Sequence, residues 1–179
     1  MNTNLEVEYL NFEEAKSMLF RECNSYDRLP TLIDLCSSMN PHQWLSVLGK
    51  IWGTCDNITD YKEDLLDTPP FAELTNNPLV WRNHMMTANE RAALAKLPPR
   101  VTIYRGCYEH NKDGLSWTIN RRVAASFPFL HRYRSRGTPL LIKATIPRDQ
   151  ILALNNDREE DEVIALRPEI QSIRHLTRP

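Results

Sequence analysis

The chain of 179 residues carries 22 basic and 23 acidic residues, so its formal net charge at neutral pH is −1. This balance disfavours a general nucleic-acid-binding protein, which usually carries a basic footprint. Its apolar fraction of 41% is enough to bury the core of one globular domain, and no uninterrupted apolar run of about 18 residues indicates a membrane-spanning helix.

The cysteines and histidines predict neither a disulfide framework nor a metal site. The four cysteines are scattered along the chain without a Cys-x-x-Cys pair: Cys23, Cys36, Cys55 and Cys107. Reduced, mostly buried thiols are therefore expected. The five histidines lack the spacing of helical zinc ligands. Because the N-terminus also lacks the pattern of a signal peptide, we expect a cytoplasmic protein, in a bacterial or a host cytosol.

Residues 1–97 have the patterns of a mainly helical region. Helices are predicted over Phe12–Cys23, Leu29–Met39, Pro41–Trp52, Asp56–Leu66 and Thr87–Leu97. Asn40 followed by Pro41 is a good helix start, and Thr87 with Glu90 forms a capping-box pattern. We expect an ordered loop, a candidate lid, from the prolines at 69–70 to Pro78. The prolines at 98–99 mark the predicted boundary with residues 98–179.

Residues 98–179 are richer in strand patterns. Strands are predicted over Val101–Tyr104, Ser116–Thr118, Leu140–Ile146, Ile151–Leu154, Val163–Leu166 and Ile170–Leu176. A short helix capped by Asn120 should end near Pro128. With few helices between the strands, the sequence predicts an α+β fold with a mixed or antiparallel sheet.

Two polar motifs lie on the first two of these strands. Arg105 follows the first strand and precedes Gly106, which lets backbone approach a ligand, so the guanidinium could hold a phosphate or a ribose hydroxyl. A surface ion pair is the alternative. Ser116 and Thr118 are two residues apart and share one strand face, while Trp117 points to the other. They could orient a carboxylate or form an ordinary solvated face.

A third motif begins the fifth strand. Glu160 and Glu162 are also two apart, so both carboxylates should project from one face. Such a pair suits glycosyl transfer, in which one carboxylate stabilises positive charge on a sugar carbon and the other orients a nucleophile. The alternative is that the acidic cluster over residues 157–162 is a solvated turn.

In this order, the three motifs resemble the arginine-serine-glutamate branch of the ADP-ribosyltransferase superfamily, over about residues 100 to 176. The resemblance implies two packed sheets with NAD held in the cleft between them. It implies that Arg105 contacts NAD, that Ser116 and Thr118 support the site, and that Glu162 is catalytic. It also implies that Glu160 presents an arginine acceptor.

Two further segments are candidates for the NAD site. Phe127 could stack on nicotinamide or belong to the core, as could Phe129. Residues 131–137 carry alternate arginines in a predicted loop, and Arg134 could bind the pyrophosphate. An exposed connection or a nucleic-acid contact are the alternatives for this loop.

The functional hypothesis is a mono-ADP-ribosyltransferase that acts on a protein, with arginine as the favoured acceptor residue. A phage or bacterial effector that modifies host or defence proteins is compatible with this hypothesis. Two alternatives remain open from the residues alone. One is an NAD glycohydrolase toxin, in which water replaces the protein acceptor, and the other is a noncatalytic binding or inhibitory module with the same fold.

Overall fold

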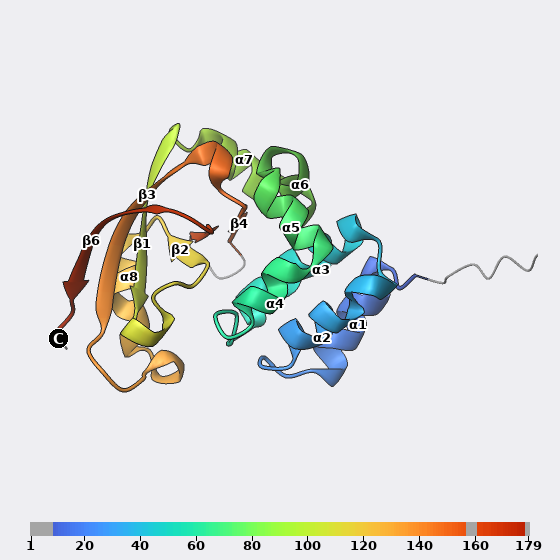
Figure 1. Ribbon diagram of the computed structural model, residues 1–179, viewed down its shortest axis with the longest axis horizontal. Coiled ribbons are helices and arrows are strands. Elements are labelled where there is room, and N and C mark those ends of the chain that lie inside the picture. The colour runs from blue at the N-terminus through green and yellow to red at the C-terminus, as the bar shows by residue number, and fades with distance from the viewer. Residues whose placement is uncertain (1–8, 157–160, 178–179) are drawn as a thin grey trace, which may run out of the picture.

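The computed structural model describes residues 9–156 and 161–177 (Figure 1). Within these residues, eight α-helices and one six-stranded antiparallel sheet form an α+β fold, and seven of the helices precede the first strand. Figure 1 shows α1–α6 gathered beside the sheet, with α7 at its upper edge. The predicted α+β class with an antiparallel sheet is therefore confirmed, and so is the helical character of the N-terminal half.

The N-terminal helices begin where the sequence supplies capping residues. They are α1 (Phe12–Glu22), α2 (Arg28–Asp34), α3 (Pro41–Ile51), α4 (Lys62–Asp67), α5 (Pro69–Asn76), α6 (Pro78–Met85) and α7 (Ala88–Lys96). The side chain of Asn40 accepts a hydrogen bond from the backbone N–H of His42, with Pro41 in the first turn. Thr87 and Glu90 form a reciprocal capping box before α7. Both predicted start signals are confirmed.

Two predictions in this half were wrong. The helix expected from Asp56 begins only at Lys62, and a short 3-10 turn, η2 (Trp52–Thr54), leads into the irregular segment before it. The segment expected to be a loop, from residues 69–70 to Pro78, forms α5 instead, and α6 begins at Pro78. The prolines that were expected to prevent helix formation lie in the first turns of these two helices. A proline lacks an N–H, but in the first turn that N–H would have no intrahelical partner. Because α5 also buries Phe71 and Leu74 completely, it is not a lid.

The strands are β1 (Arg100–Cys107), β2 (Ser116–Thr118), β3 (Leu140–Pro147), β4 (Ala153–Asn155), β5 (Glu162–Ile164) and β6 (Glu169–His175), and α8 (Arg121–Ser126) packs on β1. The order across the sheet is β4-β5-β2-β1-β3-β6. The resemblance implied two packed sheets, whereas the described strands bond as one. The link between its halves is short, however, because β1 and β2 pair only at Tyr104 and Thr118.

One hydrophobic core joins the helical half to the sheet. It contains buried residues of α3, such as Trp44 and Leu48, together with Ile103 of β1 and Val163 of β5. Polar contacts cross the same boundary: the Arg82 guanidinium on α6 donates to the backbone oxygens of residues 148 and 151 at 3.0 and 3.3 Å. The division at residue 97 stays a prediction, but the two regions pack as one body. In the part of the chain described, no helix is long and apolar enough to cross a bilayer.

Candidate functional site

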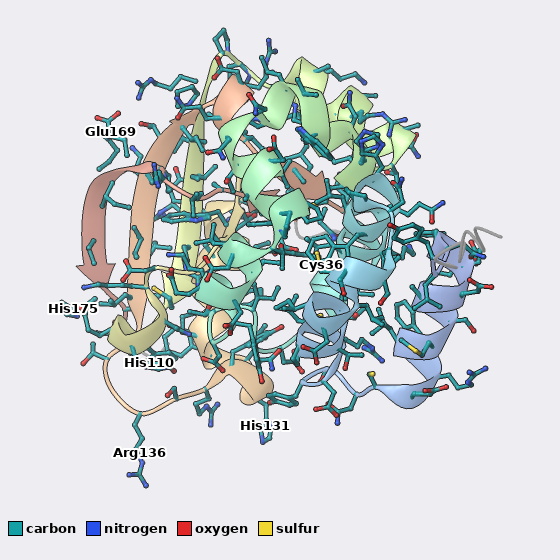
Figure 2. The ribbon with its side chains drawn as sticks, turned by 45° about the vertical axis from the view of Figure 1, so that its right-hand side comes forward. Cys36, His110, His131, Arg136, Glu169 and His175 are labelled. Atoms are coloured by element: carbon teal, nitrogen blue, oxygen red, sulfur yellow. The ribbon has the colours of Figure 1, made fainter. Side chains whose placement is uncertain are left out.

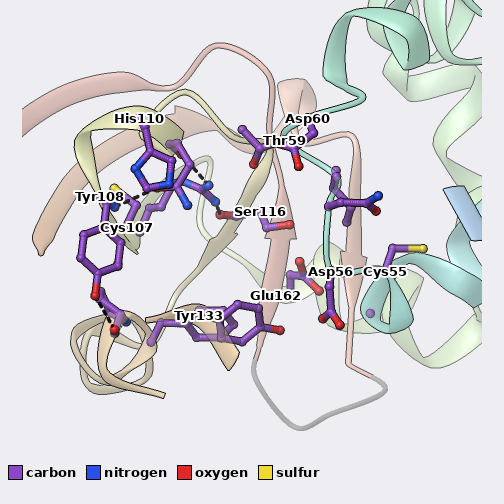
Figure 3. Close-up of a pocket in the computed structure, with 18 of the residues that line it drawn as sticks. Cys55, Asp56, Thr59, Asp60, Cys107, Tyr108, His110, Ser116, Tyr133 and Glu162 are labelled. Carbon is purple, nitrogen blue, oxygen red and sulfur yellow. Dashed lines mark hydrogen bonds between the residues drawn. The ribbon is translucent and has the colours of Figure 1, made fainter. Parts of the chain in front are cut away.

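Strands β1, β2 and β5 carry one residue of each predicted motif to the same cavity, whose volume is about 270 Å³. Arg105, Ser116 and Glu162 all line it. Figure 3 shows Cys55, Asp56, Thr59 and Asp60 along one side of this cavity and Tyr108 and His110 along the other, with Ser116 and Glu162 between them. The three motifs, separated by up to 57 positions in the chain, therefore meet in one place.

The register of the sheet explains how the hydroxyl and carboxylate motifs meet. Thr118 lies directly opposite Glu162, and Ser116 lies opposite Ile164, so the side chains of all four point to one face. Trp117 points to the other face and is 5% exposed. The prediction that Ser116 and Thr118 share a face with Trp117 turned into the core is confirmed. Thr118 Oγ1 also accepts from the backbone N–H of Asn120 at 3.0 Å, which helps turn the chain into α8.

A tryptophan from the helical half contacts Glu162. The indole Nε1–H of Trp52 donates to Glu162 Oε1 at 3.0 Å and to Ser116 Oγ at 3.3 Å. Trp52 is 1% exposed and also lines the cavity. One neutral donor thus contacts the carboxylate and the hydroxyl together.

Arg105 is held at the cavity by backbone oxygens. Its Nη1 donates to Ser116 O at 2.5 Å and its Nη2 to Asn111 O at 2.8 Å. Its buried Nε has no hydrogen-bond partner in the part of the chain described. Burial lowers the pKa of Arg105 from its usual value, while the acidic groups of Cys107 and Glu162 oppose that shift. Because an arginine has five N–H donors, this guanidinium keeps donors for an anionic ligand.

The two cysteines at the cavity are poor candidates for a nucleophile. Cys55 and Cys107 are both buried and carry free thiols. Burial raises the pKa of the Cys107 thiol, although the nearby Arg105 acts in the opposite direction. A thiol with a raised pKa is largely protonated at neutral pH and therefore unreactive. The geometry favours chemistry through charge and hydrogen bonding rather than through a thiolate.

A second, smaller hollow of about 50 Å³ adjoins the cavity. Five residues line both spaces: Arg105, Gly106, Ser116, Phe127 and Glu162. The remaining wall of the hollow includes the apolar side chains of Val123 and Ala124 on α8. The Phe127 ring stacks on Tyr133, with centroids 4.5 Å apart and an angle of 20° between the planes. Aromatic rings, a carboxylate and a guanidinium thus surround a space that suits a planar, polar group.

Gly106 is needed for the close packing of this wall. A Cβ at this position would lie 1.8 Å from the backbone oxygen of Ala124 and 2.8 Å from Cδ of Pro128. Only a glycine allows β1 to approach α8 this closely. Gly106 lines both spaces, and its contact with a ligand stays a prediction.

Of the predicted site residues that the structure describes, Arg134 lines neither the cavity nor the adjoining hollow. Arg134 donates weakly to Phe129 O at 3.4 Å and lines a separate hollow with Gly137. The neighbouring Arg136 extends away from the body of the protein (Figure 2). Glu160 lies outside the described residues, so its expected role as the acceptor-presenting carboxylate stays a prediction.

Sequence reasoning missed the wall that the helical half contributes. Trp52 was predicted as the last residue of a helix, and residues 56–60 were predicted to belong to the next helix. Asp56, Thr59 and Asp60 all line the cavity. The one available signal was the polar run from Asp56 to Asp60, which lacks the apolar spacing of a helix face.

The described residues contain no group of three or more histidine, cysteine, aspartate or glutamate side chains placed to hold a metal ion. The arrangement instead offers a guanidinium, a carboxylate and aromatic rings. No protein-family model matches this chain, and neither curated proteins nor solved structures gave a match. The argument for function therefore depends on the cavity and its residues.

Proposed function

We propose that this protein transfers ADP-ribose from NAD to a protein acceptor, with an arginine side chain as the favoured target. The observation that carries the proposal is the convergence of Arg105, Ser116 and Glu162, from three strands, on one cavity. The sequence pattern alone predicts a role in NAD chemistry for each of them. A shared cavity supports that assignment because unrelated surface motifs would have no reason to meet.

In the proposed mechanism, Arg105 binds a phosphate or a ribose hydroxyl of NAD through the N–H donors that its backbone contacts leave over. The small hollow beside Phe127 receives the nicotinamide ring. This placement brings the bond between nicotinamide and its ribose close to Glu162. Binding thus supplies orientation before any bond is broken.

Glu162 then stabilises the reaction centre. As the bond between the ribose C1′ and the nicotinamide nitrogen breaks, the electron pair leaves with nicotinamide and positive charge develops on the sugar. A carboxylate beside this carbon lowers the barrier by electrostatic attraction. The acceptor nitrogen attacks C1′ and releases a proton, which completes the transfer. Ser116 and Thr118, whose side chains share a sheet face with Glu162, help to orient the carboxylate in this mechanism.

The test compares wild type with Glu162→Gln, using NAD labelled in its adenylate part and a cell lysate as the source of acceptors. Loss of one such charge-stabilising group is expected to lower transfer by about 100-fold or more. Glu73→Gln is the matched control, because Glu73 is an exposed glutamate on α5 that does not line the cavity. It should keep full activity.

Label transfer to protein and release of nicotinamide are measured together. A fully active, folded Glu162→Gln variant would contradict the assignment of Glu162. Nicotinamide release without labelled protein would show hydrolysis of NAD in place of transfer. If the folded wild type neither binds NAD in a titration nor releases nicotinamide, the enzymatic proposal is wrong and a binding module is the better explanation.

A further inference from the structure

We propose that Trp52 is a positioning residue of this site, and that the helical half of the chain is therefore part of the catalytic unit. The inference rests on the proposed function and extends it to a residue outside the three motifs. In this view, the indole N–H of Trp52 fixes the carboxylate of Glu162 and the hydroxyl of Ser116 in one arrangement.

Trp52 is itself held firmly. It follows α3 directly, in the turn η2, and its side chain is 1% exposed. The preceding residues Leu48 and Ile51 are completely buried in the same core. A large ring fixed by core packing cannot follow a moving partner, so it sets the position of the groups that it contacts. The position of its N–H is therefore fixed by the core.

A donor in a fixed position restrains Glu162, because the last torsion of a glutamate side chain rotates easily. Rotation of the carboxylate about this torsion has broad preferences, so an unrestrained glutamate samples many orientations. The N–H of Trp52 lies 3.0 Å from Oε1 and 3.3 Å from Ser116 Oγ. Turning the carboxylate would break the first contact. The shared donor thus reduces the orientations that Glu162 can adopt before substrate binds.

The chemical nature of the donor fits the proposed role. An indole N–H is neutral, donates only and does not titrate near neutral pH. It can orient a carboxylate without cancelling the negative charge that would stabilise a positive sugar carbon. A lysine or an arginine in the same place would hold the carboxylate as firmly but would offset its charge.

The first experiment measures kcat and KM for NAD in Trp52→Phe, which removes the N–H but keeps an aromatic ring. We expect kcat to fall by about 10- to 100-fold, with KM for NAD changed by less than about threefold, because orientation and not binding is lost. Trp44→Phe is the matched control. Trp44 lies in α3, is completely buried and donates its indole N–H to Leu32 O at 2.7 Å, but it does not line the cavity. It should leave both constants unchanged.

A second experiment depends neither on turnover nor on the folding of Trp52→Phe. The chain has four tryptophans, and their indole N–H groups give separate signals in a proton–nitrogen NMR spectrum. Glu162→Gln should move one of these signals, because a neutral amide replaces the carboxylate acceptor. Glu73→Gln should move none. The signal that moves is assigned to Trp52 by its disappearance in Trp52→Phe. If that variant does not fold, the assignment rests on the presence of the signal in each of Trp44→Phe, Trp81→Phe and Trp117→Phe.

The outcomes separate this inference from the proposed function. A Trp52→Phe variant with wild-type kcat, in a protein whose wild type is active, overturns the positioning role while the proposed function stands. If no indole signal moves in Glu162→Gln, the contact itself is absent and the inference fails. A wild type that releases no nicotinamide refutes the proposed function, and with it any catalytic role for Trp52. Loss of kcat at constant KM, with a shifted indole signal, supports both.

Discussion

Gly114→Ala tests whether Arg105 is held by its two backbone hydrogen bonds. The substitution leaves unchanged the two residues that accept them, Ser116 and Asn111. A Cβ at position 114 would lie 2.1 Å from Arg105 Nη2, 2.6 Å from its Cζ and 2.8 Å from Thr59 Oγ1. Real Cβ atoms do not make contacts this short, so the guanidinium must move. It would then lose one or both of its bonds to Ser116 O and Asn111 O.

The size of the effect follows from the kind of bond that is lost. A hydrogen bond from a charged group contributes about 1.5–3 kcal/mol to stability. Loss of one such bond should lower the melting temperature of a chain of this size by about 3–12 °C, since about 1 kcal/mol corresponds to about 2–4 °C. Affinity for NAD should fall as well, because Arg105 would no longer face the cavity in the same geometry. Calorimetric titration with NAD and thermal unfolding measure the two effects separately.

Gly137→Ala is the control for the chemical change from glycine to alanine. Gly137 has a φ of 104° and no atom within 4 Å of an added Cβ, so its replacement strains the backbone by about 1–2 kcal/mol but touches nothing else. It should leave NAD affinity unchanged. If Gly114→Ala also binds NAD as wild type does and melts at the same temperature, Arg105 is not held as described and the reasoning is refuted.

Two further predictions concern packing and pH. Gly106→Ala should fail to fold or should melt far below wild type in a thermal scan, because its Cβ would lie 1.8 Å from Ala124 O. A wild-type melting temperature would show that α8 can move away from β1. Burial lowers the pKa of His84, and the charges of His42 and Arg91 act in the same direction. The unfolded chain therefore binds more protons just below pH 6.5, so stability should fall as pH drops through that range. In urea unfolding at several pH values, His84→Gln should show a flatter dependence, and an unchanged slope would count against this explanation.

Local signals in the sequence identified most of the helices and strands. The capping patterns at Asn40 and Thr87 placed the starts of α3 and α7, and Asn120 placed the start of α8. Such signals are readable because a cap satisfies backbone groups within the same few residues. The strand patterns of β1 and β3 were equally local, since alternate residues face the core.

The errors arose where a local signal has two meanings. Pro69 and Pro78 were read as the edges of a loop, but both begin helices. Proline is compatible with either place, and burial of Phe71 and Leu74 by the surrounding helices decides between them. The single sheet, in place of the two that were expected, likewise depends on how β2 pairs with both β1 and β5.

The sequence by itself determined which chemical groups the site offers: a guanidinium at Arg105, a hydroxyl at Ser116 and a carboxylate at Glu162, each at a known place on a strand. Their spacing of two residues also determined which side chains share a face, because strand geometry fixes that locally. Only the tertiary structure decided that the three meet in one cavity and that Arg134 lies in a separate hollow. It also decided that Trp52 contacts Glu162 across 110 positions of sequence. No local pattern encodes such a contact, because it results from the packing of helices against the sheet.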